Sequence, residues 1–346
     1  MLARVATFAI DGVDPRQVSV EVDIRSGLPT FTIVGLADAA VRESRDRIRA
    51  AILNSNFVFP GVRITANLAP AYLKKVGPGF DAAIALAILA ASEQLPASSL
   101  SSYAVFGELS LTGELRDTPG ALAIAEGARS AGIRRLIVPR DRAHEAGLVG
   151  GLVIAGVSTL VEAADTVSSG RISAPPPPTQ RQPRAAHEPD LADVRGHAGP
   201  VMALQIAAAG GHNLLLEGPP GTGKTMLARR LPSILPQMTH EEAIEVTRIH
   251  SVAGLHAHGL ITSRPFRAPH HTVSAAGLVG GGSPPRAGEA TLANHGVLFL
   301  DELPEFDRSV LEVLRQPLED QKVTISRATM SLTFPASFML AAAMNP

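Results

Sequence analysis

The stretch LLLEGPPGTGKTMLARRL, residues 214–231, decides how the second half of this chain folds. It begins as a short apolar segment typical of a buried strand, is rich in glycine and proline at its centre, and ends with a helical composition. Its centre matches the pattern G-x-x-x-x-G-K-[ST] between a strand and a helix, where this pattern binds nucleotide phosphates. The expected binding residues are Gly218, Pro219, Pro220, Gly221, Thr222, Gly223, Lys224 and Thr225.

The residue types of this loop suit a triphosphate. Glycine allows successive backbone N–H groups to curl around phosphate oxygens, because a Cβ atom would block their approach. We expect Lys224 to reach the β- and γ-phosphates and Thr225 to offer a hydroxyl group to Mg²⁺. The helix that starts there should add the positive end of its dipole. The sequence therefore predicts that ATP and Mg²⁺ bind here.

A second motif, GVLFLDELPEF at residues 296–306, indicates hydrolysis. Its apolar residues are typical of a central parallel strand, and two carboxylates, Asp301 and Glu302, follow directly. We expect Asp301 to hold Mg²⁺ through water and Glu302 to polarise the attacking water. A third apolar segment, residues 337–346, contains Asn345 near its end, where the side chain could reach the γ-phosphate or that water.

Composition limits the remaining possibilities. The 346 residues suffice for two domains, and the net charge of −1 gives no overall attraction to nucleic acid or membrane. The absence of cysteine excludes disulfides and thiolate metal sites. The most apolar helical run, residues 82–91, is about half the length that crosses a bilayer, and the opening residues become acidic too early for a signal peptide. We expect a cytoplasmic protein with no membrane partner.

The clearest boundary is the proline-rich stretch at residues 168–190, which we interpret as a semi-rigid linker between residues 1–167 and residues 191–346. The first part is expected to be one α/β or α+β domain, and the second to open with a helix closed by two glycines and a short buried strand. In the first domain, strands are expected at 18–24, 30–35, 63–69 and 135–139, and helices at 38–55, 80–92 and 119–133.

Three smaller features have competing interpretations. Four arginines share one predicted helix with interleaved acidic residues, so we favour a solvated face over a phosphate-binding stripe; they are Arg42, Arg45, Arg47 and Arg49. Five histidines in a glycine-rich region lack the spacing and acidic partners of a metal site; they are His250, His256, His258, His270 and His271. Residues 321–334 alternate β-branched and polar residues, which predicts a hairpin with Arg327 near its tip.

The phosphate loop, the strand ending in Asp-Glu and the strand ending in Asn, in that order, resemble an AAA+ ATPase module. More narrowly, residues 193–231, RPFRAPHHTVSAAGLVGGG (264–282) and LRQPLEDQKVTISRA (314–328) resemble the magnesium-chelatase-like branch, and within it the ComM/YifB family of bacterial competence-related ATPases. The resemblance implies that residues 218–225 form the Walker A site, that Asp301 and Glu302 form Walker B, and that Asn345 is sensor 1.

The same resemblance implies partners. It predicts a homo-hexameric ring that binds ATP between subunits and acts on single-stranded or branched DNA, as a helicase or in branch migration during natural transformation. In this branch the hairpin before sensor 1 points toward the pore, so Arg327 is either a DNA contact or part of a plain edge hairpin. The resemblance also implies a fifth core strand, an arginine finger, a helical lid and a sensor 2 arginine after residue 346. We therefore expect these 346 residues to be a C-terminally truncated version of a longer protein, with impaired hydrolysis.

The first domain resembles the proteolytic domain of Lon, which has a ribosomal S5 domain 2-like fold. The similar stretches are residues 77–88, 106–115 and 120–139. Lon uses a serine and a lysine as its catalytic dyad. Here the serine region, residues 77–81, contains no hydroxyl or thiol, and the lysine region, residues 122–124, contains no basic group. We expect a Lon-like fold without peptidase activity, used for assembly or DNA contact.

Two classes of function remain open, with a nucleotide-binding chain without turnover as a third. One is a DNA-translocating ATPase, and the other is an ATP-driven remodeller of protein, comparable to the motor subunit of magnesium chelatase. The Lon-like domain favours the first, because chelatase motor subunits are not expected to carry it.

Overall fold

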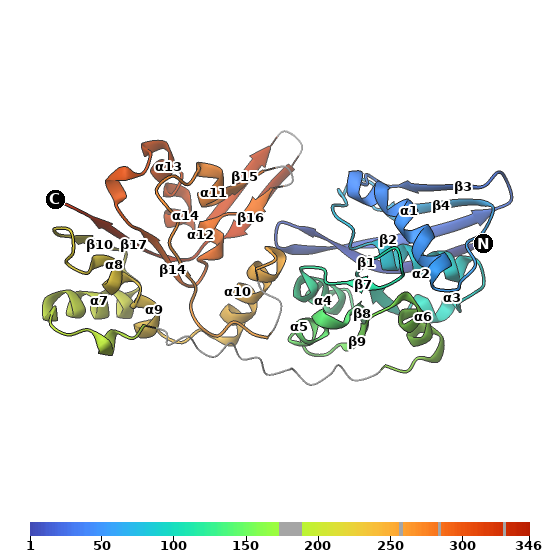
Figure 1. Ribbon diagram of the computed structural model, residues 1–346, viewed down its shortest axis with the longest axis horizontal. Helices are drawn as coiled ribbons and strands as arrows, with labels where there is room; N and C mark the ends of the chain where they lie inside the picture. The colour runs from blue at the N-terminus through green and yellow to red at the C-terminus, as the bar shows by residue number, and fades with distance from the viewer. Residues whose placement is uncertain (173–188, 256–258, 283–284, 328–329) are drawn as a thin grey trace. The chain divides into compact units, whose positions relative to one another are not determined.

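Two separate sheets organise the part of the chain that the computed structural model describes, which is residues 1–172, 189–255, 259–282, 285–327 and 330–346 (Figure 1). The chain divides into two compact units, Met1–Thr179 with Gly254–Gly259, and Gln180–Ala253 with Leu260–Pro346. Most of the predicted linker, residues 173–188, lies outside the described residues. Within the described residues, no helix is long and apolar enough to span a membrane.

The N-terminal unit is built on a mixed seven-stranded sheet with the order β3-β4-β2-β1-β5-β8-β9 (Figure 1). The strands β1, β2 and β4 pair antiparallel, whereas the β3–β4 pair and the pairs that join β1, β5, β8 and β9 are parallel. The strands are β1 (Leu2–Asp11), β2 (Asp14–Arg25), β3 (Thr30–Val34), β4 (Arg63–Ala69), β5 (Tyr103–Val105), β8 (Arg135–Pro139) and β9 (Val153–Val157), with a small β6 (Glu108–Leu109) and β7 (Leu115–Arg116) pair.

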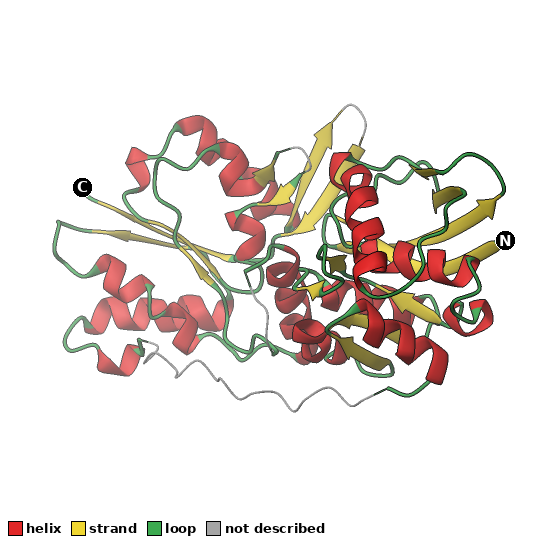
Figure 2. Ribbon diagram, turned by 45° about the vertical axis from the view of Figure 1, so that its right-hand side comes forward, coloured by secondary structure: helices red, strands yellow, loops and turns green. Residues whose placement is uncertain are grey.

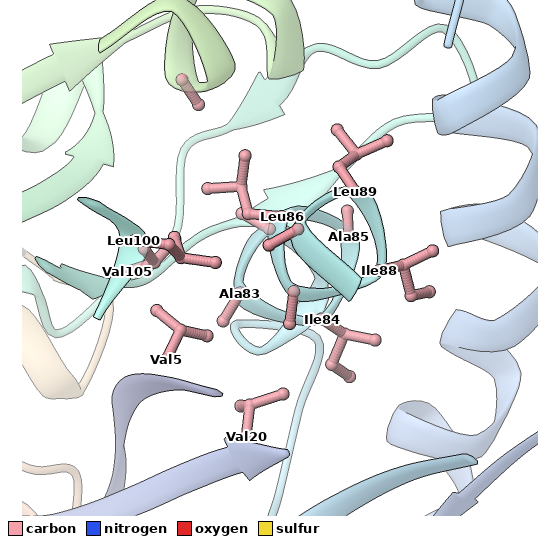
Figure 3. Close-up of a cluster of buried hydrophobic side chains, with 14 of the residues drawn as sticks. Val5, Val20, Ala83, Ile84, Ala85, Leu86, Ile88, Leu89, Leu100 and Val105 are labelled. Carbon is pink, nitrogen blue, oxygen red and sulfur yellow. The ribbon is translucent and has the colours of Figure 1, made fainter. Parts of the chain in front are cut away.

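One helix lies at the centre of this unit. All residues of α2 (Asp81–Ala91) are buried, because the helix is apolar on every side and packs against β1, β2 and α1. Figure 3 shows its side chains beside Val5 and Val20 of the sheet. The other helices are α1 (Ala39–Asn54), α3 (Ala97–Leu100), α4 (Ala121–Ser130), α5 (Ala143–Gly147) and α6 (Leu160–Ser169).

The C-terminal unit is a three-layer α/β/α arrangement around a parallel sheet with the order β10-β17-β14-β11. Alternate residues of β14 face opposite layers: Val297 and Phe299 pack toward α7, α8 and α9, and Leu298 and Leu300 pack toward α11 and α13. Figure 2 shows helices on both sides of these strands. The sheet strands are β10 (Leu214–Glu217), β11 (Phe266–Arg267), β14 (Val297–Leu300) and β17 (Met339–Met344).

The remaining elements of this unit are helices of 4 to 13 residues and two hairpins. The hairpins are β12 (Gly280–Gly281) with β13 (Arg286–Ala287), and β15 (Lys322–Arg327) with β16 (Met330–Pro335). The helices are α7 (Ala198–Gly210), α8 (Lys224–Ala228), α9 (Leu231–Ile234), α10 (His240–Val252), α11 (Ala275–Val279), α12 (Glu289–Leu292), α13 (Arg308–Glu312) and α14 (Arg315–Asp320).

This architecture confirms the predicted fold class, a Lon-like α+β unit followed by a parallel α/β/α unit. One local expectation was wrong. The strand β10 is only half buried, with Leu215 51% exposed, because it is the end strand of the described sheet and one of its faces lies open. The helix expected to start at the phosphate loop is present as α8, and it is short because Pro232 lacks an N–H group and its ring would clash with the helix carbonyl four residues earlier.

Candidate nucleotide-binding site

The phosphate loop joins the end of β10 to the start of α8. Gly221 and Gly223 have φ angles of +80° and +79°, the left-handed region that glycine adopts without strain. The Thr222 hydroxyl donates a hydrogen bond of 2.8 Å to the Pro219 carbonyl, which closes the loop on itself. The Gly218 N–H donates to the Met344 carbonyl at 3.3 Å and so fixes the loop to the end of β17.

The ammonium group of Lys224 lies inside the curve of this loop. Its Nζ atom donates hydrogen bonds to the carbonyls of Gly218 (2.7 Å) and Pro219 (3.0 Å) and to Oδ1 of Asn345 (3.0 Å). All three acceptors are neutral, and a phosphate oxygen is a stronger acceptor for an ammonium group. The side chain is therefore positioned to bind phosphate.

Oxygen atoms suited to Mg²⁺ lie next to this lysine. Thr225 Oγ1 donates a hydrogen bond of 2.7 Å to Asp301 Oδ2, and Asp301 Oδ1 accepts one of 3.1 Å from the Glu302 N–H. Hydroxyl and carboxylate oxygens are the ligands that Mg²⁺ prefers, and this ion usually binds through one or two carboxylates together with substrate phosphates. The donor set of the site fits a magnesium–nucleotide complex.

The carboxylate of Glu302 is the most exposed of these groups. Its backbone is left-handed, with φ of 54°, and its side chain is 61% exposed. The nearest ring nitrogen is Nδ1 of His271, which lies 3.8 Å from Glu302 Oε2. Sequence reasoning considered His271 only as a metal ligand and missed this neighbour, since 31 positions separate the two residues.

A pocket of about 430 Å³ brings most of the predicted residues together. Its lining is Pro220, Gly221, Gly223, Lys224, Thr225, Met226, Asp301, Glu302, Ala343, Met344 and Asn345. Gly218, Pro219 and Thr222 belong to the loop without lining this space. Arg327 is not part of it: this residue ends β15, where its backbone pairs with Met330. His256 and His258 lie outside the described residues, and no cluster of three possible metal ligands occurs within them.

Gly79, in the stretch that resembles the serine region of Lon, is closely packed. A Cβ atom added to Gly79 would lie 2.4 Å from Cε2 of Phe106, so a serine would not fit there without displacing the ring. Asp81, fully buried, accepts hydrogen bonds from Arg47 Nε (2.7 Å) and from the Leu109 N–H (3.3 Å). Burial raises the pKa of Asp81, and the bond to Arg47 opposes that rise. The expected solvated face was therefore wrong for Arg47, which is held by this carboxylate.

Parallel strands whose carboxyl ends carry a glycine-rich phosphate loop, an Asp-Glu pair and an asparagine define a P-loop nucleoside triphosphatase. Comparison with known proteins agrees. A family profile described as magnesium chelatase, subunit ChlI, matches residues 190–346, and a profile described as subunit ChlI of Mg-chelatase matches residues 20–142.

Relatives extend this match to the whole chain. The chain is 47% identical over 346 residues to the uncharacterized protein YifB of Escherichia coli strain K12, covering 100% of this chain and 68% of that protein. It is 47% identical over 353 residues to the competence protein ComM of Haemophilus influenzae, covering 100% of this chain and 69% of that protein. Lon protease 2 of Bacillus subtilis is 29% identical over 147 residues, which is 40% of this chain and 27% of that protease. This chain belongs to the ComM/YifB family of magnesium-chelatase-like AAA+ ATPases.

Proposed function

We propose that this protein is an ATP-driven motor that acts on DNA, with a ComM-like helicase or branch-migration role in natural transformation or recombination. The observation that carries the proposal is the convergence of Lys224, Thr225, Asp301, Glu302 and Asn345 on one pocket. The identity of 47% over the whole chain to a competence protein supports DNA as the polymer. We further propose a cytoplasmic location without a membrane partner.

In this proposal each side chain has one task. Lys224 binds the β- and γ-phosphates, and Thr225 and Asp301 hold Mg²⁺, which would neutralise charge on the phosphate oxygens. Glu302 accepts a proton from the attacking water, and Asn345 orients that water or the γ-phosphate. The hydrogen bond between Asn345 and Lys224 supports this division, because it holds two groups that would face the same phosphate.

The proposed path of the DNA runs along the β15–β16 hairpin. Lys322, Thr324 and Ser326 of β15 are exposed and polar, and Arg327 ends the same strand. The hairpin leads through residues 336–338 into β17, after which Asn345 follows, so a displacement of the hairpin would act on the strand next to the pocket. The motor would act as a homo-hexameric ring around single-stranded or branched DNA.

A second candidate is an ATP-driven remodeller of protein, as in magnesium chelatase. It is favoured by the descriptions of both family profiles, which name the ChlI subunit. One of these profiles covers residues 20–142, so the Lon-like domain does not distinguish the two candidates, contrary to our argument from the sequence.

A four-way DNA junction tests the proposal. The full-length protein with ATP and Mg²⁺ should resolve a labelled synthetic junction into two duplexes, and the Glu302→Gln variant should not. A wild-type protein that hydrolyses ATP but leaves junctions and forked duplexes intact would instead favour the protein remodeller.

A further inference from the structure

The carboxylate of Glu302 has one neighbour among the described residues that can orient it. Nδ1 of His271 lies 3.8 Å from Oε2 of Glu302, and no other hydrogen bond or ion pair of this carboxylate occurs among the described residues. A separation of 3.8 Å exceeds a hydrogen bond, so the two groups would bond after a shift of roughly 1 Å. Contacts in active sites are commonly long without substrate and tighten in the reacting complex.

Aromatic contacts set the direction of the His271 ring. The ring of His270 lies 4.0 Å from it, centroid to centroid, and the ring of Phe306 meets it edge-on at 6.4 Å and 79°. Phe306 is buried and follows Glu302 by one short helical turn, η3 (Leu303–Glu305). His271 thus packs against the same segment that carries the carboxylate.

The backbone on either side of His271 is anchored. Before it, Arg267 of β11 donates two hydrogen bonds to the Glu289 carboxylate, at 2.6 and 2.9 Å. After it, the Ser274 side chain accepts a hydrogen bond of 3.1 Å from the Gly277 N–H at the start of α11. The position of His271 therefore depends on where α11 lies.

Helix α11 in turn packs on the β15–β16 hairpin. Val279, the last residue of α11, packs in one cluster with Val323 and Ile325 of β15. The next residue, Gly280, is so close to the hairpin that an added Cβ atom would lie 3.0 Å from Ile325 Cδ1. The hairpin packs on the end of α11, three residues join the start of α11 to His271, and His271 lies 3.8 Å from the Glu302 carboxylate.

We propose that His271 is a positioning residue that directs the Glu302 carboxylate toward the attacking water, and that the packing of α11 on the β15–β16 hairpin sets its position. This inference rests on the proposed function and adds a route by which a polymer bound at the hairpin changes turnover. His271 does not line the nucleotide pocket, so the route acts on the rate of hydrolysis and leaves ATP affinity unchanged. A misplacement of about 1 Å can lower a rate by about 10²-fold.

Steady-state kinetics of the full-length protein test the positioning role. His271→Ala should lower kcat by roughly 10- to 10²-fold while KM for ATP stays within about twofold. His271→Asn, which keeps a polar group near the carboxylate, should recover part of the loss. His240→Ala, at the exposed start of α10, is the matched control and should leave kcat unchanged. Thermal melting of each variant separates a loss of rate from a loss of fold.

A double variant tests whether His271 acts through Glu302. Because both changes would remove the same function, His271→Ala in the Glu302→Gln background should slow hydrolysis no further. Val279→Ala weakens the packing that sets the position of His271, so it should lower kcat in the same direction as His271→Ala and also reduce the stimulation of kcat by a single-stranded oligonucleotide. Losses that multiply in the double variant, or an unchanged kcat in His271→Ala, would overturn the inference. A wild-type protein that hydrolyses ATP without a response to DNA would contradict the proposed DNA motor and leave the kcat comparison as the test of His271.

Discussion

Asn345 Oδ1 accepts a hydrogen bond of 3.0 Å from Lys224 Nζ although 121 positions separate the two residues. The strands that precede them, β10 and β17, are parallel neighbours, so their carboxyl ends meet at one edge of the sheet. Asp301 follows β14, the next parallel strand along, and reaches the same edge. Asp301 and Asn345, directly after their strands, and Lys224, after the phosphate loop that follows β10, therefore enter one pocket, which is the physical basis of the site.

Nucleotide affinity should depend on the charge of Lys224. Lys224→Ala removes the side-chain charge that binds the β- and γ-phosphates, so titration with a fluorescent ATP analogue should show the loss of most of the affinity. Lys74→Ala, an exposed lysine of the other unit, serves as the control. Wild-type binding by Lys224→Ala would refute the assignment of the phosphate loop.

Hydrolysis and binding should separate at Glu302. Glu302→Gln keeps the shape of the side chain but cannot accept a proton, so turnover should fall by roughly 10²- to 10⁴-fold while ATP still binds. Single-turnover hydrolysis and equilibrium binding, measured on the same preparation, check this. If binding fell as much as turnover, Glu302 would be a structural residue and not the catalytic base.

The response to DNA should depend on Arg327. Arg327→Ala should weaken DNA-stimulated turnover and spare the rate without DNA, because the arginine would contact a phosphate of the DNA and not the nucleotide. Arg308→Ala, which removes an exposed ion pair with Glu312, is the control. Unchanged stimulation would exclude the hairpin from the DNA path. DNA binding should also weaken steeply with salt, and a flat salt dependence would favour a protein substrate.

The N-terminal unit should lose stability when Asp81 loses its partner. Arg47→Ala leaves a fully buried carboxylate without its ion pair, so the free energy of unfolding should fall by roughly 3–5 kcal/mol in chemical denaturation. Arg45→Ala, on the same helix but 54% exposed, should change it by less than about 0.5 kcal/mol. Equal effects of the two substitutions would show that the pair is unimportant.

The same variant should change the dependence of stability on pH. Burial raises the pKa of Asp81, so the folded protein binds this proton more tightly than the unfolded chain does. The stability that the protonated Asp81 side chain adds to the folded protein is therefore fully present below its unfolded pKa of about 3.9 and is lost as the pH rises through the folded pKa. Removing Arg47 raises the folded pKa further, so Arg47→Ala should lose more stability between acid and neutral pH than the wild type. The double variant Arg47→Ala with Asp81→Asn should not show that extra loss, because asparagine does not titrate.

Local patterns in the sequence predicted the fold well where periodicity was strong. The predicted strands at 30–35 and 63–69 and the helix at 38–55 agree with β3, β4 and α1 to within one or two residues, because β4 and α1 bury one regular face and β3 alternates exposed and half-buried residues. The gathering of polar residues at the ends of the strands could also be predicted, because the carboxyl ends of parallel strands meet at one edge of a sheet.

Contacts between distant segments could not be predicted in this way. His271 meets Glu302, and Arg47 meets Asp81, only because the sheets bring separate helices and loops together. Neither pair has a spacing that marks it in the sequence. The strand β9 was also missed, because its sequence VIAGV has no polar residue to alternate with and contains alanine and glycine, which have low strand propensity.

Stimulation of ATP turnover by DNA tests the central claim most directly. The full-length protein would be assayed with Mg²⁺ and saturating ATP, alone and with single-stranded, duplex or branched DNA of matched length, with Glu302→Gln as the blank. We predict that single-stranded or branched DNA raises kcat and that added salt abolishes the increase. A wild-type rate that is measurable but identical with and without every DNA would contradict the assignment of this protein as a DNA motor.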